Sequence, residues 1–126
     1  MAQQGFKDPV DNPYELGKLV QFDQREFVHM DFDTSTFKDF GLVYIPNACE
    51  SKNCYVHAIL HGCNQSLDDI TKNYGYNEFA AANDIILLYP DSTCWGFNKT
   101  LDDPQWLTMN GVMPSAIMGM LNRTTM

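Results

Sequence analysis

The residues most able to take part in chemistry lie in one loop, residues 61–65 (His-Gly-Cys-Asn-Gln), directly after an apolar segment. In an open α/β sheet, ligands bind outside the carboxyl ends of the strands, and this loop would occupy that position. Gly62 allows a backbone turn that a side chain would obstruct. The N–H of Cys63 would then point into the crevice, where a backbone donor stabilises the oxyanion of an acyl-transfer intermediate. Cys63, Gly62 and His61 are therefore the candidate site residues.

Two alternative chemistries would use side chains of the same loop. His57, His61 and Cys63 would share one face of a strand by alternation, and both residue types are common zinc ligands. A fourth ligand is not evident, and a histidine on a strand is more often simply hydrogen-bonded, so we predict no metal and no cofactor. A Cys63 thiolate with His61 as its base would be a nucleophile, but a disulfide at Cys63 would exclude it.

Strands are predicted on the amino-terminal side of this loop. Residues 18–22 form a possible short strand, and the β-branched and aromatic residues between Gly41 and Pro46 indicate a stronger one. Residues 54–60 lead into the loop and follow a polar stretch of hairpin-loop length. We therefore expect residues 41–46 and 54–60 to form an antiparallel pair.

Helical signals follow the loop. Ser66 can cap a helix that begins near Leu67, with Asp69 three residues later as in a capping box. Gly75 interrupts this helix, and residues 76–82 resume the helical pattern. The loop is therefore expected to connect a strand to a helix.

The apolar run at residues 85–89 ends at Pro90 and is typical of a parallel strand buried on both faces. With the preceding strand and helix it forms a βαβ unit, which implies a layered α/β architecture. Apolar residues recur at helical spacing over residues 112–121, with Pro114 in the first turn, where a missing N–H is tolerated. The predicted fold class is α/β, a small mixed sheet with a βαβ unit and a covering C-terminal helix.

The length, composition and net charge limit the classes of function that this chain can have. The chain has 126 residues, of which 44 % are hydrophobic, the size of one small domain. We divide it into an irregular segment, residues 1–16, and a domain, residues 17–126. The net charge of -8 opposes nucleic-acid binding, which relies on clustered Lys and Arg. No apolar stretch approaches the roughly 20 residues that span a bilayer, so no membrane association is expected, and no signal peptide is evident.

Several segments taken together resemble one family. Leu-His-Gly-Cys-Asn-Gln at residues 60–65, Tyr-Gly-Tyr-Asn at 74–77, Leu-Tyr-Pro at 88–90 and Cys-Trp at 94–95 are similar to the poly(3-hydroxybutyrate) depolymerases and related secreted esterases. Residues 17–27 and 41–46 continue the likeness. Each piece alone is weak, whereas the combination is specific.

The resemblance implies a secreted α/β-hydrolase that cleaves a hydroxyalkanoate polyester or small esters with a Ser-His-Asp triad. It implies that the N–H of Cys63 contributes to the oxyanion hole. It also implies that an intact relative is located outside the cell. Four cysteines allow three pairings, and the resemblance favours Cys49 with Cys54 and Cys63 with Cys94.

One departure decides the predicted mechanism. The serines are at positions 35, 51, 66, 92 and 115, and none lies in the Gly-x-Ser-x-Gly elbow of this chemistry. We therefore expect a partial α/β-hydrolase that holds the oxyanion-hole portion, acts on an ester only when completed by the missing half, and is inactive alone. The alternative is a noncatalytic binding or interaction protein that presents Trp95 and an open sheet edge to a partner.

Two further residues lie near the end of the 85–89 strand. Trp95 would form a wall of the substrate crevice, although a buried packing aromatic is the commoner role. Asp91 follows the strand end and invites assignment as a catalytic acid. The resemblance places that acid elsewhere, so we interpret Asp91 as a turn residue.

Overall fold

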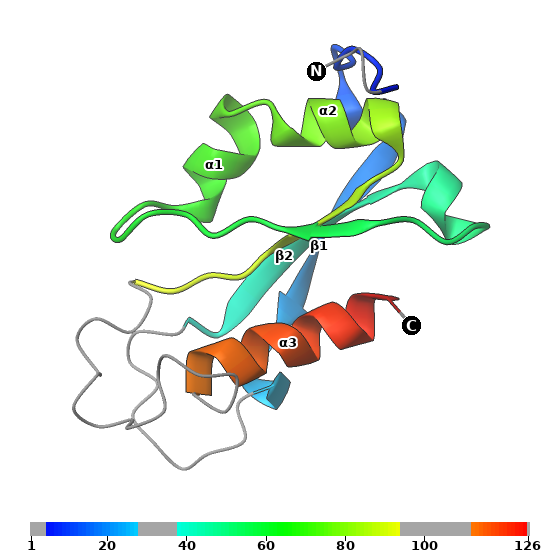
Figure 1. The fold of residues 1–126 in the computed structure, drawn as a ribbon. Helices are drawn as coiled ribbons and strands as arrows, with labels where there is room; N and C mark the ends of the chain where they lie inside the picture. Colours follow the sequence, from blue (N-terminus) through cyan, green and yellow to red (C-terminus); the bar gives the residue numbers. More distant parts are fainter. Residues whose placement is uncertain (1–4, 28–37, 94–111, 126) are drawn as a thin grey trace.

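The computed structural model describes residues 5–27, 38–93 and 112–125, and within these ranges the strands form one mixed sheet (Figure 1). The strands are β1 (Gly17–Asp23), β2 (Phe40–Pro46), β3 (Val56–Ala58) and β4 (Ile86–Tyr89). Their order across the sheet is β1-β2-β4-β3. The mixed sheet predicted from the sequence is confirmed.

The pairing of β2 differs from the prediction. β2 is antiparallel to both β1 and β4, and β3 pairs in parallel with β4 alone. The expected antiparallel pair between residues 41–46 and 54–60 is therefore wrong, because β4 lies between them. All four residues of β4 are buried, which fits a strand that needs neighbours on both edges and cover on both faces.

The connection from β3 to β4 is helical, as the sequence indicates. It contains α1 (Leu67–Asn73) and α2 (Tyr76–Asn83). The predicted cap is present, since the Ser66 hydroxyl oxygen accepts from the Asp69 N–H at 3.1 Å. Gly75 separates the two helices at φ 77°, a backbone conformation that glycine adopts without strain. Strand, helices and parallel strand form the predicted βαβ unit.

Helices cover opposite faces of the sheet. In Figure 1, α1 and α2 lie on one side and α3 (Val112–Thr125) crosses the other. The first side holds a cluster of buried apolar side chains from Tyr44, Ile59, Leu67, Ile70, Ala80, Ala81, Leu87 and Tyr89. The second side packs Phe27 and Leu88 against Ala116 and Met120 of α3. Burying each of these large side chains contributes about 1.5–3 kcal/mol. Because α3 packs on this face of the sheet, it is the covering helix that the sequence predicts.

Residues 5–16 run beside α2. The Val10 N–H donates to the Glu78 carbonyl oxygen at 3.2 Å, and the Phe6 and Phe79 rings lie 5.4 Å apart. A short 3₁₀ turn, η2 (Pro13–Glu15), precedes β1 and accepts the Tyr44 hydroxyl at the Pro13 carbonyl oxygen, 2.7 Å away. The division into residues 1–16 and 17–126 stays a prediction.

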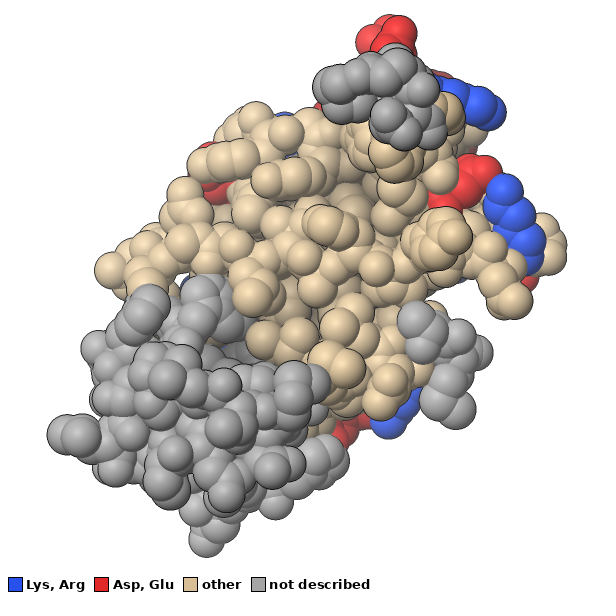
Figure 2. Space-filling view, viewed as in Figure 1, with Lys and Arg blue, Asp and Glu red and all other residues tan. Residues whose placement is uncertain are grey.

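The charged side chains are mostly exposed. Figure 2 shows few of them across the middle of one face, with acidic and basic side chains adjacent at its margins. Exposed ion pairs join Lys18 to Glu50 at 3.0 Å and Lys52 to Asp84 at 2.7 Å, and such pairs contribute only about 0–1 kcal/mol each. In the described part of the chain, no helix is long and apolar enough to cross a membrane.

Candidate functional site

The predicted loop lies at the carboxyl ends of β3 and β4. Its backbone is held by three hydrogen bonds. The Gly62 N–H donates to Gln65 Oε1 at 2.6 Å, the Gln65 N–H donates to the Gly62 carbonyl oxygen at 3.1 Å, and the Asn64 N–H donates to the Thr93 carbonyl oxygen at 2.8 Å. These contacts fix the peptide groups on both sides of Cys63, and they tie the loop to the segment that follows β4.

Gly62 has a different role from the one predicted. The residue in the left-handed region is Asn64, at φ 64°, a conformation that asparagine tolerates better than most residues. At Gly62 the constraint is space, because an added Cβ would lie 2.9 Å from Gln65 Oε1. The absence of a side chain lets the Gln65 amide close over the Gly62 N–H.

His61 is buried beneath the loop. Its side chain is fully covered, its Nδ1 lies 2.7 Å from the Gly62 carbonyl oxygen, and its Nε2 lies 2.7 Å from Asp91 Oδ1. The zinc alternative placed His57, His61 and Cys63 on one strand face. That placement is wrong, because β3 ends at Ala58 and only His57, which is exposed, belongs to the strand.

Asp91 is part of this buried arrangement. We interpreted it as a turn residue, and the structure corrects this, because Asp91 is only 9 % exposed and contacts the His61 ring. The Lys38 ammonium lies 3.8 Å from the second carboxylate oxygen. The available signal was the position of Asp91 just beyond a buried strand, at the sheet edge where the loop was already placed.

Gln24 holds the Asp91 backbone and was missed by the sequence reasoning. It follows β1 in η3 (Gln24–Phe27) and is 1 % exposed. Its Oε1 accepts from the Asp91 N–H at 2.8 Å, and its Nε2 donates to the carbonyl oxygens of Asp91 at 2.9 Å and Lys38 at 2.7 Å. A buried glutamine at the end of an edge strand carries no distinctive sequence pattern.

The cysteines limit what the loop can do. Cys49 and Cys54 form a disulfide, as the resemblance implied. Cys63 is also disulfide-bonded, and its predicted partner Cys94 lies outside the described residues, as does Trp95. A bonded sulfur is neither a thiolate nucleophile nor a zinc ligand, so both alternatives for Cys63 fail. Within the described residues, no cluster of three or more His, Cys, Asp or Glu could hold a metal ion.

No protein-family model matches this chain, but curated relatives do. A poly(3-hydroxybutyrate) depolymerase from Delftia acidovorans is 30 % identical over 122 residues, covering 86 % of this chain and 24 % of that enzyme. A polyhydroxybutyrate depolymerase from Talaromyces funiculosus is 41 % identical over 58 residues, covering 41 % of this chain and 17 % of that enzyme. The chain thus spans about a quarter or less of these relatives.

Solved structures share the fold. The PHB depolymerase from Penicillium funiculosum matches with a TM-score of 0.70 and 23 % identity, over 93 % of this chain and 43 % of that one. A PHB depolymerase complexed with an R3HB trimer matches with a TM-score of 0.70 and 24 % identity, over 94 % of this chain and 43 % of that one. Over most of its length this chain is similar to polyhydroxybutyrate depolymerases. Its architecture is the partial α/β-hydrolase fold expected from the sequence.

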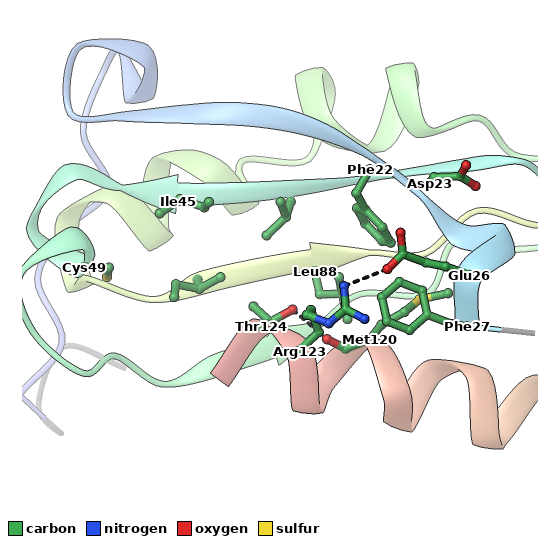
Figure 3. A pocket seen from close by; sticks show the side chains of 12 residues that line it. Phe22, Asp23, Glu26, Phe27, Ile45, Cys49, Leu88, Met120, Arg123 and Thr124 are labelled. Atoms are coloured by element: carbon green, nitrogen blue, oxygen red, sulfur yellow. Dashed lines mark hydrogen bonds and ion pairs between the residues drawn. The ribbon is translucent and has the colours of Figure 1, made fainter. Parts of the chain in front are cut away.

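A cavity of the depolymerase-like chain lies away from the loop. Its volume is about 370 Å³, and it opens between the sheet and α3 (Figure 3). The sheet contributes Val43, Ile45 and Leu88, and an ion pair of 2.6 Å joins Glu26 to Arg123 of α3 across it. His61 and Asp91 do not line it, so we assign the cavity no part in the loop chemistry.

Two buried tyrosines of the depolymerase-like chain are structural. Burial raises the pKa of Tyr44 to about 12 and also raises the pKa of Tyr89. The Tyr89 hydroxyl donates to Asn77 Oδ1 at 2.6 Å, which links β4 to α2. Both hydroxyls therefore stay protonated and serve as hydrogen-bond donors inside the sheet-and-helix core.

Proposed function

We propose that this chain supplies the oxyanion-binding loop and one wall of the substrate crevice of a carboxyl-ester hydrolase. The Cys63 N–H is the donor, Gly62 and His61 belong to the same site, and Trp95 is the proposed wall. The single observation that carries the proposal is the loop of residues 61–65, held rigidly at the carboxyl ends of two parallel strands.

Rigidity is what this chemistry requires. An oxyanion donor is effective when it already points at the position where negative charge develops, and one such donor contributes about 10²–10³ in kcat. The Gly62 carbonyl oxygen receives both the Gln65 N–H and the His61 ring, and the next peptide is tied to Thr93. Because these contacts bracket the 62–63 peptide, the direction of the Cys63 N–H is fixed before any substrate binds.

The proposed substrate is a hydroxyalkanoate polyester or a small ester. Both curated relatives are named as depolymerases of polyhydroxybutyrate, and one solved relative is complexed with an R3HB trimer. We propose that the nucleophile lies in the part of the hydrolase that this chain does not match. Among the described serines, Ser66 caps α1 and Ser92 is fully buried, so neither suits attack on a bound ester.

We also propose an extracellular location for the complete enzyme. The Cys49–Cys54 disulfide and the bonded Cys63 are compatible with an oxidising compartment, where such bridges persist.

A chimera tests the function. The matched segment of the Penicillium funiculosum depolymerase is replaced by this chain, and hydrolysis of a short-chain nitrophenyl ester is measured for the chimera and for this chain alone. We expect activity from the chimera and none from the chain. A folded but inactive chimera would overturn the proposal. So would hydrolysis by the chain alone that survives alanine at all five of its serine positions.

A noncatalytic interaction protein is the second candidate, and the edge of β3 favours it. β3 is the terminal strand of the described sheet, and Tyr55 beside it is 87 % exposed. Tyr55 and Ile59 carry hydrogen bonds to β4, so the backbone groups of Val56 and Ala58 face outward and can pair with another extended segment. The chimera separates the two: an active chimera favours the hydrolase, whereas a folded, inactive chimera together with a stable compact monomer of this chain in solution favours this candidate.

A further inference from the structure

We propose that Asp91 and His61 are positioning residues that orient and polarise the peptide group between Gly62 and Cys63. This inference rests on the proposed function, because it explains how the proposed oxyanion donor is set. It assigns Asp91 a role that the sequence pattern did not suggest.

The geometry forms an uninterrupted chain of contacts. Asp91 Oδ1 lies 2.7 Å from His61 Nε2, and His61 Nδ1 lies 2.7 Å from the Gly62 carbonyl oxygen. That carbonyl and the Cys63 N–H belong to the same peptide group, which is planar. The orientation of the carbonyl therefore dictates the orientation of the N–H, which points the opposite way.

The same contacts make the N–H a better donor. A hydrogen bond to a peptide carbonyl draws electron density toward the oxygen and makes the N–H of that peptide a better donor, which strengthens the hydrogen bond it donates by about 10–30 %. His61 has a fully covered side chain, and the Asp91 side chain is 12 % exposed, so water screens this effect weakly. Both ring nitrogens lie within hydrogen-bond distance of oxygen atoms, and Nδ1 is the donor to Gly62 because a carbonyl oxygen can only accept.

Asp91 is itself anchored, which makes the series of contacts from Asp91 through His61 to Gly62 rigid. Its backbone N–H and carbonyl oxygen are held by Gln24, and the Lys38 N–H also donates to that carbonyl oxygen at 3.2 Å. The Lys38 ammonium lies 3.8 Å from the Asp91 carboxylate and adds favourable charge. Residues at the ends of β1, β2 and β4 thus converge on Asp91, whose carboxylate in turn contacts the His61 imidazole.

Nuclear magnetic resonance of the full chain tests the arrangement directly. In His61→Gln and Asp91→Ala variants, we expect the Gly62 carbonyl carbon and the Cys63 amide nitrogen to shift upfield, because the hydrogen bond on the carbonyl is lost or weakened. Asp91→Asn should retain most of the contact, since the asparagine amide can donate to His61 Nε2 while Nδ1 still donates to Gly62. The matched control is Asp68→Asn, which removes an exposed carboxylate paired with Lys72 on α1.

Two outcomes would overturn the inference: a Gly62 carbonyl signal that is unmoved in both His61→Gln and Asp91→Ala, or one that moves equally in Asp68→Asn. The chimera adds a functional readout. There, His61→Gln should lower kcat about ten-fold with KM unchanged, because a transition-state interaction is weakened rather than substrate binding. An inactive parent chimera with intact resonance shifts would refute the proposed function alone, whereas an active chimera insensitive to His61→Gln would refute the inference alone.

Discussion

The side-chain amide of Gln24 pairs with the backbone of Asp91 in both directions, accepting from its N–H at 2.8 Å and donating to its carbonyl oxygen at 2.9 Å. The two residues are 67 positions apart in the sequence. The Gln24 side chain thus makes the two hydrogen bonds that a neighbouring strand would make to Asp91, and it joins the end of β1 to the segment that follows β4. The proposed loop therefore depends on a residue far from it in the chain.

Gln24→Ala should destabilise the chain by about 2–4 kcal/mol, because it leaves several buried backbone groups without their partner. Urea unfolding followed by circular dichroism measures the loss. Gln21→Ala, at an exposed position of β1, is the matched control and should change the free energy of unfolding by no more than about 0.5 kcal/mol. Equal losses in the two variants would show that the Gln24 amide carries no special role.

Gly41→Ala should also be destabilising, by about 1–3 kcal/mol, through steric overlap. An added Cβ would lie 2.8 Å from Gln24 Oε1 and 2.9 Å from the Tyr89 carbonyl oxygen, and the latter is backbone that cannot rotate away. Gly119→Ala in α3 is the comparison, since its tightest contact is 3.3 Å to the Phe27 ring and alanine favours helix. Thermal unfolding of both variants checks the order, and a smaller loss for Gly41→Ala would contradict it.

The local elements of this fold could be predicted because their signals span only a few residues. Ser66 and Asp69 indicate where α1 begins, and Gly75 indicates where it separates from α2. The apolar run of β4 indicates a strand that is buried on both faces. The order of the strands could not be predicted in the same way. β3 has only three residues, and its place beside β4 rather than β2 depends on contacts made across the sheet.

The candidate site shows the same division. The position of residues 61–65 follows from the strand and helix on either side of them. The contact between His61 and Asp91 joins residues 30 positions apart, so no local pattern reports it, and a buried carboxylate has the same sequence signature as a turn residue. Gln24 is harder still, because it acts through backbone groups that every residue possesses.

Alkaline pH should destabilise the chain through Tyr44. Burial raises the pKa of Tyr44 from 10.0 to about 12, so the unfolded chain loses the phenol proton more readily than the folded one. The resulting stability is fully present below pH 10 and is lost as the pH rises from 10 toward 12, at up to about 1.4 kcal/mol per pH unit. Urea unfolding at pH 8, 10 and 11 measures the slope.

The Tyr44→Phe variant isolates this contribution. It should be less stable than the parent at pH 8, because the hydroxyl donates to the Pro13 carbonyl oxygen at 2.7 Å. Its stability should fall less steeply above pH 10. Tyr55→Phe removes an exposed hydroxyl and should keep the parent profile. A Tyr44→Phe variant with an unchanged alkaline slope would show that Tyr44 is not the group responsible.

Gln65→Ala should impair the proposed loop with little loss of stability. The Gln65 amide oxygen accepts from the Gly62 N–H at 2.6 Å, and the residue is exposed, so its removal leaves the core intact. In the chimera we expect kcat to fall about ten-fold, because the 61–62 peptide, which adjoins the peptide that carries the Cys63 N–H, loses its hydrogen bond and the donor is less well directed. Tyr74→Phe is the matched control, since it removes only the 3.3 Å contact between the Tyr74 hydroxyl and the Gln65 amide nitrogen. Ester hydrolysis and urea unfolding of both variants decide the matter, and a Gln65→Ala chimera with parental kcat would count against a preorganised oxyanion loop.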